Sequence, residues 1–261
     1  MKPIILLLSI TMLFAACQSN DKPADEAQWQ QLFNGKDLTG WTPKIAGYEA
    51  GDNYGNTFRV EDGILKVSYS EYDTFGTRFG HLFYEKPFSH YKLRVEYRFI
   101  GEENMSGVGD WAFKNSGVMF HSQSMESMSV EQEFPVSLEA QFLGGSETFN
   151  NQPTGKLCTP GLHVIMGDTL TKGHCVEVDG TTFKGEEWIT FEVIAKGDEI
   201  MHHIVNGDTV ITYSKPTVGG QFLPENYELA EGTPVKSGYI ALQSESHPVE
   251  FRKVEIMEIK E

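Results

Sequence analysis

Two short runs in the middle of the chain, Asn115-Ser-Gly-Val-Met-Phe-His-Ser-Gln123 and Val136-Ser-Leu-Glu-Ala-Gln-Phe142, alternate between two kinds of side chain. This two-residue period is typical of β-strands, in which successive side chains point to opposite faces of a sheet. One predicted face is apolar and carries Val118, Phe120, Val136, Leu138, Ala140 and Phe142. The opposite face carries Asn115, Met119, His121, Gln123, Ser137, Glu139 and Gln141. Each run therefore predicts a strand with one face for a core and one face rich in polar groups.

A third run near the C-terminus, Gly238-Tyr-Ile-Ala-Leu-Gln-Ser-Glu-Ser-His247, has the same period. Ile240 and Leu242 alternate there with Gln243, Glu245 and His247. If the three strands share a sheet, their polar faces combine into one patch of His, Glu and Gln. We expect a functional site on that patch.

The rest of the chain repeats the same theme of short strands and tight turns. The expected strands cover residues 58–67 (a hairpin around Asp62-Gly63), 91–99, 188–194, 200–205, 209–213 and 249–256. No long segment has a helical period. The pattern predicts an all-β fold, an antiparallel β-sandwich or jelly roll, as one domain over residues 30–261.

The composition excludes one class of partner. The chain of 261 residues has 21 Lys and Arg against 37 Asp and Glu, a formal charge of −16. Phosphate backbones are bound by clustered basic residues, and the chain has no such cluster. We therefore expect no nucleic-acid partner.

The N-terminus has the features of an export signal. Residues 1–17 carry one Lys and an apolar run too short to span a bilayer stably, ending in Leu13-Phe-Ala-Ala-Cys17. This ending resembles a bacterial lipoprotein signal with Cys17 as the lipidated residue, whereas the alternative is an ordinary secretory signal. The polar residues 18–29 predict a disordered tether. The expected location is the bacterial cell envelope, with the protein lipid-anchored in the periplasm or at the outer membrane.

Cys158 and Cys175 are the other two cysteines. In an oxidising compartment a disulfide is the default expectation. A free thiol or a metal site with the nearby His163 and His174 are the alternatives. A disulfide would hold the segment around His163 rigid.

Several segments resemble one family. They are Leu32-Phe-Asn-Gly-Lys-Asp-Leu-Thr-Gly-Trp41, Val60-Glu-Asp-Gly63, Glu96-Tyr-Arg98, Asn115-Ser-Gly117, Leu138-Glu-Ala-Gln141 and Gly238-Tyr-Ile-Ala-Leu-Gln243 with His247 and Phe251-Arg252. In this order they resemble the 3-keto-disaccharide hydrolase domain over roughly residues 30–259. The resemblance implies a jelly roll of the concanavalin A-like lectin or glucanase type. His121 and Gln123 stand where relatives often have a basic residue, and the Cys158–Cys175 region looks like a subgroup insertion.

The resemblance also implies a reaction, cleavage of glycosides already oxidised to a ketone at C3. A C3 ketone acidifies the C2 proton, so a base can remove it and the C1 substituent can leave. Glu139 is the expected base and His121 the expected acid or electrophile, with His163 reaching in from the disulfide-held loop. An upstream sugar 3-dehydrogenase would supply the ketone.

Further residues are expected to bind the glycoside or oligosaccharide substrate. These are Asp110 and Trp111 at the rim, and Gln123, Gln141, Gln243, Glu245 and His247 on the polar patch. His121, Glu139 and His163 could together hold a divalent cation, although the sequence has no compact ligand motif.

Two other functions fit the sequence. A conventional retaining glycosidase would use Glu139 and Glu245 as its carboxyl pair, at a separation of about 5–5.5 Å. A non-catalytic carbohydrate-binding lipoprotein would present exposed aromatic platforms and no perturbed titratable group.

Overall fold

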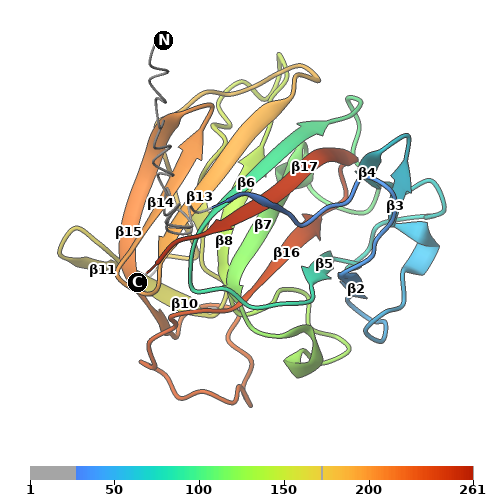
Figure 1. Cartoon of the computed structure of the whole chain (residues 1–261). Helices are drawn as coiled ribbons and strands as arrows, with labels where there is room; N and C mark the ends of the chain where they lie inside the picture. The colour runs from blue at the N-terminus through green and yellow to red at the C-terminus, as the bar shows by residue number, and fades with distance from the viewer. Residues whose placement is uncertain (1–27, 172, 261) are drawn as a thin grey trace, which may run out of the picture.

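The protein is a sandwich of two antiparallel β-sheets (Figure 1). The computed structural model describes residues 28–171 and 173–260. In Figure 1 the strands of the larger sheet lie in front of β7, β8 and β16 of the smaller one. The predicted all-β sandwich is confirmed.

The larger sheet has ten strands. In spatial order they are β11 (Thr169–Thr171), β10 (Leu162–Met166), β15 (Asp208–Val218), β14 (Ile200–Val205), β13 (Ile189–Lys196), β6 (His90–Phe99), β17 (Val249–Glu258), β4 (Ile64–Val67) and β3 (Phe58–Glu61), with β1 (Gln30–Gln31) paired to β17. The hairpin predicted over residues 58–67 is β3 and β4.

The smaller sheet has seven strands. Their order is β12 (Cys175–Val176), β9 (Leu157–Cys158), β8 (Leu138–Leu143), β7 (Asn115–Ser122), β16 (Tyr239–Ser244), β5 (Gly80–Tyr84) and β2 (Trp41–Ile45). Short 3₁₀ turns span Tyr54–Asn56 (η1), Asp110–Ala112 (η2) and Met125–Ser127 (η3).

The three patterned runs lie side by side as β8, β7 and β16, as the sequence predicts. Their apolar residues are buried in the core between the two sheets. Tyr97 of the larger sheet stacks on Phe142 of β8 with ring centroids 4.0 Å apart. The residues that alternate with this core must therefore face away from it, on the outer surface of the smaller sheet.

One residue breaks the alternation. His121, near the end of β7, has a positive φ of 48°, and the pairing of β7 with β16 shifts register between Tyr239 and Ala241. Such a bulge turns a side chain to the other face. The His121 ring accordingly contacts Tyr91 of β6 in the core. The prediction that His121 shares a face with Glu139 is wrong for this reason.

The predicted signal segment, the lipidation site Cys17 and most of the predicted tether lie outside the described residues. Trp29, placed in the tether by its sequence, packs under Arg94 of β6 at 4.0 Å. Trp29 therefore packs against the larger sheet. Among the described residues, no helix has the length and apolarity needed to cross a membrane.

The predicted disulfide is confirmed. Cys158 and Cys175 are bonded, and they face each other as register partners of β9 and β12. Cys158 is in turn the register partner of Glu139 on β8. The bond therefore fixes the edge of the smaller sheet beside Glu139.

Replacing both cysteines by Ser tests the contribution of this bond to stability. The bond spans a sequence separation of 17, and closure of such a loop stabilises by about 3 kcal/mol in the chain-entropy model. We expect the free energy of unfolding, measured by urea titration, to fall by about that amount. An unchanged urea midpoint would show that the strand edge is held by other contacts.

Candidate active site

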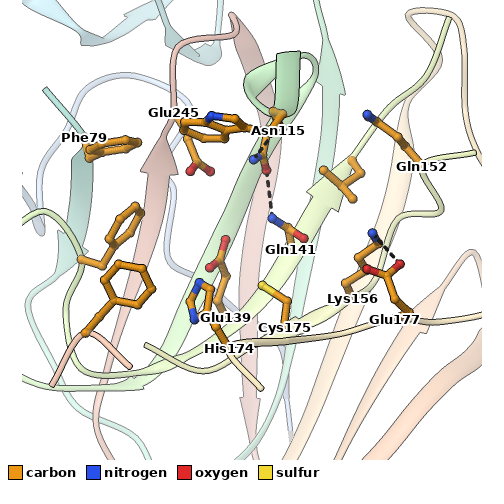
Figure 2. A pocket seen from close by; sticks show the side chains of 14 residues that line it. Phe79, Asn115, Glu139, Gln141, Gln152, Lys156, His174, Cys175, Glu177 and Glu245 are labelled. Carbon is orange, nitrogen blue, oxygen red and sulfur yellow. Dashed lines mark hydrogen bonds and ion pairs between the residues drawn. The ribbon is translucent and has the colours of Figure 1, made fainter. Parts of the chain in front are cut away.

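A cavity of about 460 Å³ lies on the outer face of the smaller sheet. Figure 2 shows the side chains that surround it. They are Phe79, Trp111, Asn115, Phe134, Glu139, Gln141, Leu143, Gln152, Lys156, His174, Cys175, Glu177, Phe222 and Glu245. A volume of this size suits a small ligand of one or two sugar units.

Glu139 lies at the base of the cavity. It faces outward because it alternates with the core residues Leu138 and Ala140 on β8. Its side chain leans over Gly117 of β7, where a Cβ atom would lie 2.7 Å from Glu139 Oε1. The glycine of the Asn-Ser-Gly run therefore makes room for the carboxyl group.

Glu245 enters the same cavity from the segment that follows β16. Figure 2 shows the carboxyl groups of Glu139 and Glu245 pointing toward one another from separate segments of the chain. Their residues are only 3% and 5% exposed. Glu139 Oε1 and Glu245 Oε2 are buried without a hydrogen-bond partner.

This environment raises the pKa of both carboxyl groups. For Glu139 the main cause of the raised pKa is burial, and the neighbouring Gln243 amide acts in the opposite direction. This amide makes no hydrogen bond of ordinary geometry. For Glu245 burial acts first, and the nearby Glu139 carboxyl raises the pKa further. Two buried carboxyl groups without a cation cannot readily ionise together.

His174 supplies the one imidazole that borders the cavity. The residue precedes Cys175, so the disulfide holds it near Glu139, as Figure 2 shows. Its Nδ1 is buried without a partner, and burial lowers the pKa of its ring. A neutral imidazole at pH 7 follows, with one N–H to donate.

Aromatic side chains form one wall of the cavity. Phe79 stacks on Trp111 with centroids 6.1 Å apart and lies 4.8 Å from Phe134. Phe222 continues the wall and lies 4.7 Å from the His174 ring. Trp111 and Phe222 are 52% and 51% exposed, as expected for surfaces that receive a ligand.

Polar groups form the facing wall. Gln141 donates to Asn115 Oδ1 at 3.3 Å. Lys156 is paired with Glu177 at 2.6 Å. Amides and an ion pair of this kind can exchange partners with sugar hydroxyls.

The structure brings together four of the predicted site residues, Glu139, Gln141, Glu245 and Trp111. Gln243 lies beside Glu139, next to the cavity. Asp110 precedes Trp111 in η2 but is exposed and does not line the cavity.

The two other predicted catalytic histidines lie elsewhere. His121 Nε2 is 2.9 Å from the Gly197 carbonyl oxygen, on the core side of the sheet. His163 is on β10 of the larger sheet, where its ring lies against Gly219 and Gly220. The side chains of His121, Glu139 and His163 do not converge, so these three residues do not together form a cation site.

Two residues predicted to bind substrate instead make contacts within the fold. Gln123 accepts from the Val136 backbone N–H at 2.7 Å and donates to Ser127. His247 is buried between Phe99 and Phe113. Neither residue lines the cavity.

Sequence reasoning missed His174, Asn115 and the aromatic residues Phe79, Phe134 and Phe222. Asn115 was on the predicted polar face, and its position opposite Gln141 could have identified it. His174 had a signal too, because it adjoins a disulfide cysteine. The three Phe residues come from separate loops, and no sequence pattern joins them.

Comparison with known proteins assigns the chain to a family. The chain belongs to the family of the 3-keto-alpha-glucoside-1,2-lyase-like domain, whose family model matches residues 28–257. This membership makes it a carbohydrate-acting protein. Among curated protein sequences, none matches the chain.

Solved structures share the fold at low identity. A protein of Parabacteroides distasonis with the provisional name glycosyl hydrolase is 16% identical, with a TM-score of 0.53 over 89% of this chain and 100% of that one. The carbohydrate-binding module CBM66 of Bacillus subtilis is 10% identical, with a TM-score of 0.48 over 84% and 96%. A protein of B. subtilis with a galectin-like fold is 10% identical, with a TM-score of 0.44 over 88% of this chain and 94% of that one.

The raised carboxyl pKa values predict a loss of stability at alkaline pH. A group whose pKa is higher in the folded state than in the unfolded state stabilises the fold at a pH below its unfolded pKa. This stabilisation is lost as the pH rises through the folded pKa. We expect the free energy of unfolding to fall between about pH 7 and about pH 9, where unfolded histidines are already mostly neutral. In a Glu139→Gln/Glu245→Gln variant the curve should be flatter.

The matched control is Glu258→Gln, which changes an exposed carboxyl group on β17. Its pH dependence should follow that of the wild type. Parallel curves for the double variant and the wild type would contradict the assignment of raised pKa values to the cavity pair.

Proposed function

We propose that the protein cleaves glycosides that carry a ketone at C3, by removal of the C2 proton and elimination of the C1 substituent. The observation that carries the proposal is the buried Glu139 carboxyl group, lying over Gly117 in an aromatic-walled cavity. Family membership supports the substrate class. A carboxyl group with a raised pKa is a stronger base than an ordinary one once it is ionised.

The bond changes are as follows. Glu139 takes the proton from C2, and the electron pair forms an enediolate with the C3 oxygen. The C3 carbonyl then re-forms as the C1–O bond breaks, which leaves a C1=C2 double bond and releases the protonated leaving group. Water can add to this double bond, hydroxide to C1 and a proton to C2, giving the free 3-keto sugar.

His174 is the candidate electrophile. A neutral ring can donate its N–H to the C3 oxygen and stabilise the negative charge that develops there. The disulfide and the contact with Phe222 hold the ring in place. This role replaces the one that the sequence suggested for His121 and His163.

The polar and aromatic walls of the cavity orient the substrate. Asn115 and Gln141 can hydrogen-bond sugar hydroxyls, while Trp111 presents a flat face to the sugar C–H groups. Water exclusion by the aromatic wall strengthens each polar contact inside the cavity.

The proposal extends to the cellular context. The protein would be exported, processed at Cys17 and anchored by lipid in the bacterial cell envelope. A separate oxidoreductase would supply the 3-keto substrate, because the proposed elimination starts from a sugar that is already oxidised. The N-terminal sequence supports the first statement, and the proposed chemistry supports the second.

A conventional retaining glycosidase is the second candidate, favoured by the two carboxyl groups in one cavity. Such an enzyme needs one carboxylate as nucleophile. The carboxyl pair offers the same charge state to either reaction, and family membership favours the 3-keto substrate, so we place this function second.

Product analysis by NMR separates these functions. Residues 28–261 would be incubated with a methyl 3-keto-glucoside and with the unoxidised parent. We expect cleavage of the keto substrate alone, and a loss of about 10²–10⁴-fold for Glu139→Gln, the usual contribution of a general base. Glu258→Gln should retain the wild-type rate.

Each other outcome has a definite meaning. Cleavage of the parent glucoside would establish an ordinary glycosidase. Ligand-induced shifts without cleavage of either compound would leave a carbohydrate-binding protein.

A further inference from the structure

The elimination needs an acid for the departing oxygen, and His121 does not reach the cavity. We propose that Glu245 is that acid, so that Glu139 and Glu245 share one proton and act as a base–acid pair. The inference rests on the proposed function and adds a catalytic residue to it. The argument comes from the placement of the two carboxyl groups.

The two groups approach the cavity from different elements. Glu139 rises from β8, and Glu245 comes from the segment after β16, with β7 between these strands. Figure 2 shows the carboxyl groups directed toward a common space. A glycoside in that space would have one carboxyl group near C2 and the other near the C1 oxygen.

The surroundings favour a single negative charge on the pair. Lys156 lines the cavity, but its Nζ is already paired with Glu177. His174 is neutral, because burial lowers the pKa of its ring. Tyr69 also interacts with Glu245, and burial keeps its hydroxyl protonated. Burial likewise lowers the pKa of His81, the register partner of Gln243, so its ring is neutral. Ionising the second carboxyl group would therefore place two like charges in one buried site.

The position of His174 decides which group acts as the base. His174 lies near Glu139, as Figure 2 shows, and is the candidate donor to the C3 oxygen. A sugar held in this way has C2, the neighbour of C3, on the side of Glu139 and the C1 oxygen on the side of Glu245. Glu139 is therefore the base and Glu245 the proton donor.

In the cycle, the proton taken from C2 goes to Glu139, and the proton on Glu245 goes to the leaving oxygen as the C1–O bond breaks. The pair then holds the same number of protons as before, with their positions exchanged. Water addition in the reverse sense, in which Glu245 takes a proton from water and Glu139 returns one to C2, restores the starting state.

A leaving-group series tests the role of Glu245. Wild type, Glu139→Gln and Glu245→Gln would be compared on methyl and 4-nitrophenyl 3-keto-glucosides. A 4-nitrophenolate leaves without protonation, whereas methoxide does not. We expect Glu245→Gln to lose about 100-fold or more on the methyl compound and less than about fivefold on the nitrophenyl compound. Glu139→Gln should be slow on both.

Equal losses of Glu245→Gln on the two compounds would overturn the proposal, because a binding or packing role does not depend on leaving-group acidity. If Glu245→Gln fails to fold, the cleavage rates of the wild type on a series of leaving groups decide. With an acid present, these rates vary little with the acidity of the leaving group. A steep dependence of the rate on that acidity would overturn the proposal. Failure of the wild type to cleave any 3-keto-glucoside would refute the proposed function and this inference together. Cleavage by the wild type, with equal losses of Glu245→Gln on the two compounds, would refute the role of Glu245 and leave the proposed function standing.

Discussion

Two carboxyl groups buried in one cavity without a cation are the constraint on which the site depends. Removing a carboxylate from water is costly, and a protein normally offsets that cost with a paired cation. The outer face of the larger sheet does so throughout its central strands. Its ion pairs are Arg94 with Glu192 and Glu255, Arg98 with Glu250, and Glu96 with Arg252 and Lys253. Glu139 and Glu245 lack such partners, so the fold maintains them at a cost to its stability.

Several local features serve this arrangement. Gly117 leaves the space into which the Glu139 carboxyl group leans. The Cys158–Cys175 disulfide joins the strand next to β8 to the short strand β12, which His174 immediately precedes. Phe79, Phe134 and Phe222 pack in sequence to form the aromatic wall of the cavity. The larger sheet contributes the rigid platform against which β7, β8 and β16 pack.

Much of this could be predicted from the alternation of residues. The two-residue period predicted three strands and put Glu139, Gln141 and Glu245 on their polar faces. The structure adds that β7, β8 and β16 share one sheet, so that these faces combine on its outer side. The failure at His121 has a local cause, because a bulge with positive φ at a non-glycine residue leaves no mark in the sequence pattern. His163 and His174 both lie between Cys158 and Cys175, and only the pairing of β12 with β9 shows that His174 reaches the cavity. The aromatic wall depends on contacts between distant loops, which periodicity does not encode.

The central claim is that Glu139 removes the proton from C2, and deuterium incorporation tests it most directly. The protein would be incubated with a methyl 3-keto-glucoside in D₂O, and the earliest 3-keto-glucose formed would be examined by NMR against an enzyme-free exchange control. Elimination, exchange of the Glu139 proton with solvent and addition of D₂O predict deuterium at C2 of the product, formed at a rate that falls in Glu139→Gln. Product that retains its original hydrogen at C2, from a substrate whose cleavage is no slower when C2 carries deuterium, would contradict the account, because direct hydrolysis at C1 never breaks the C2–H bond.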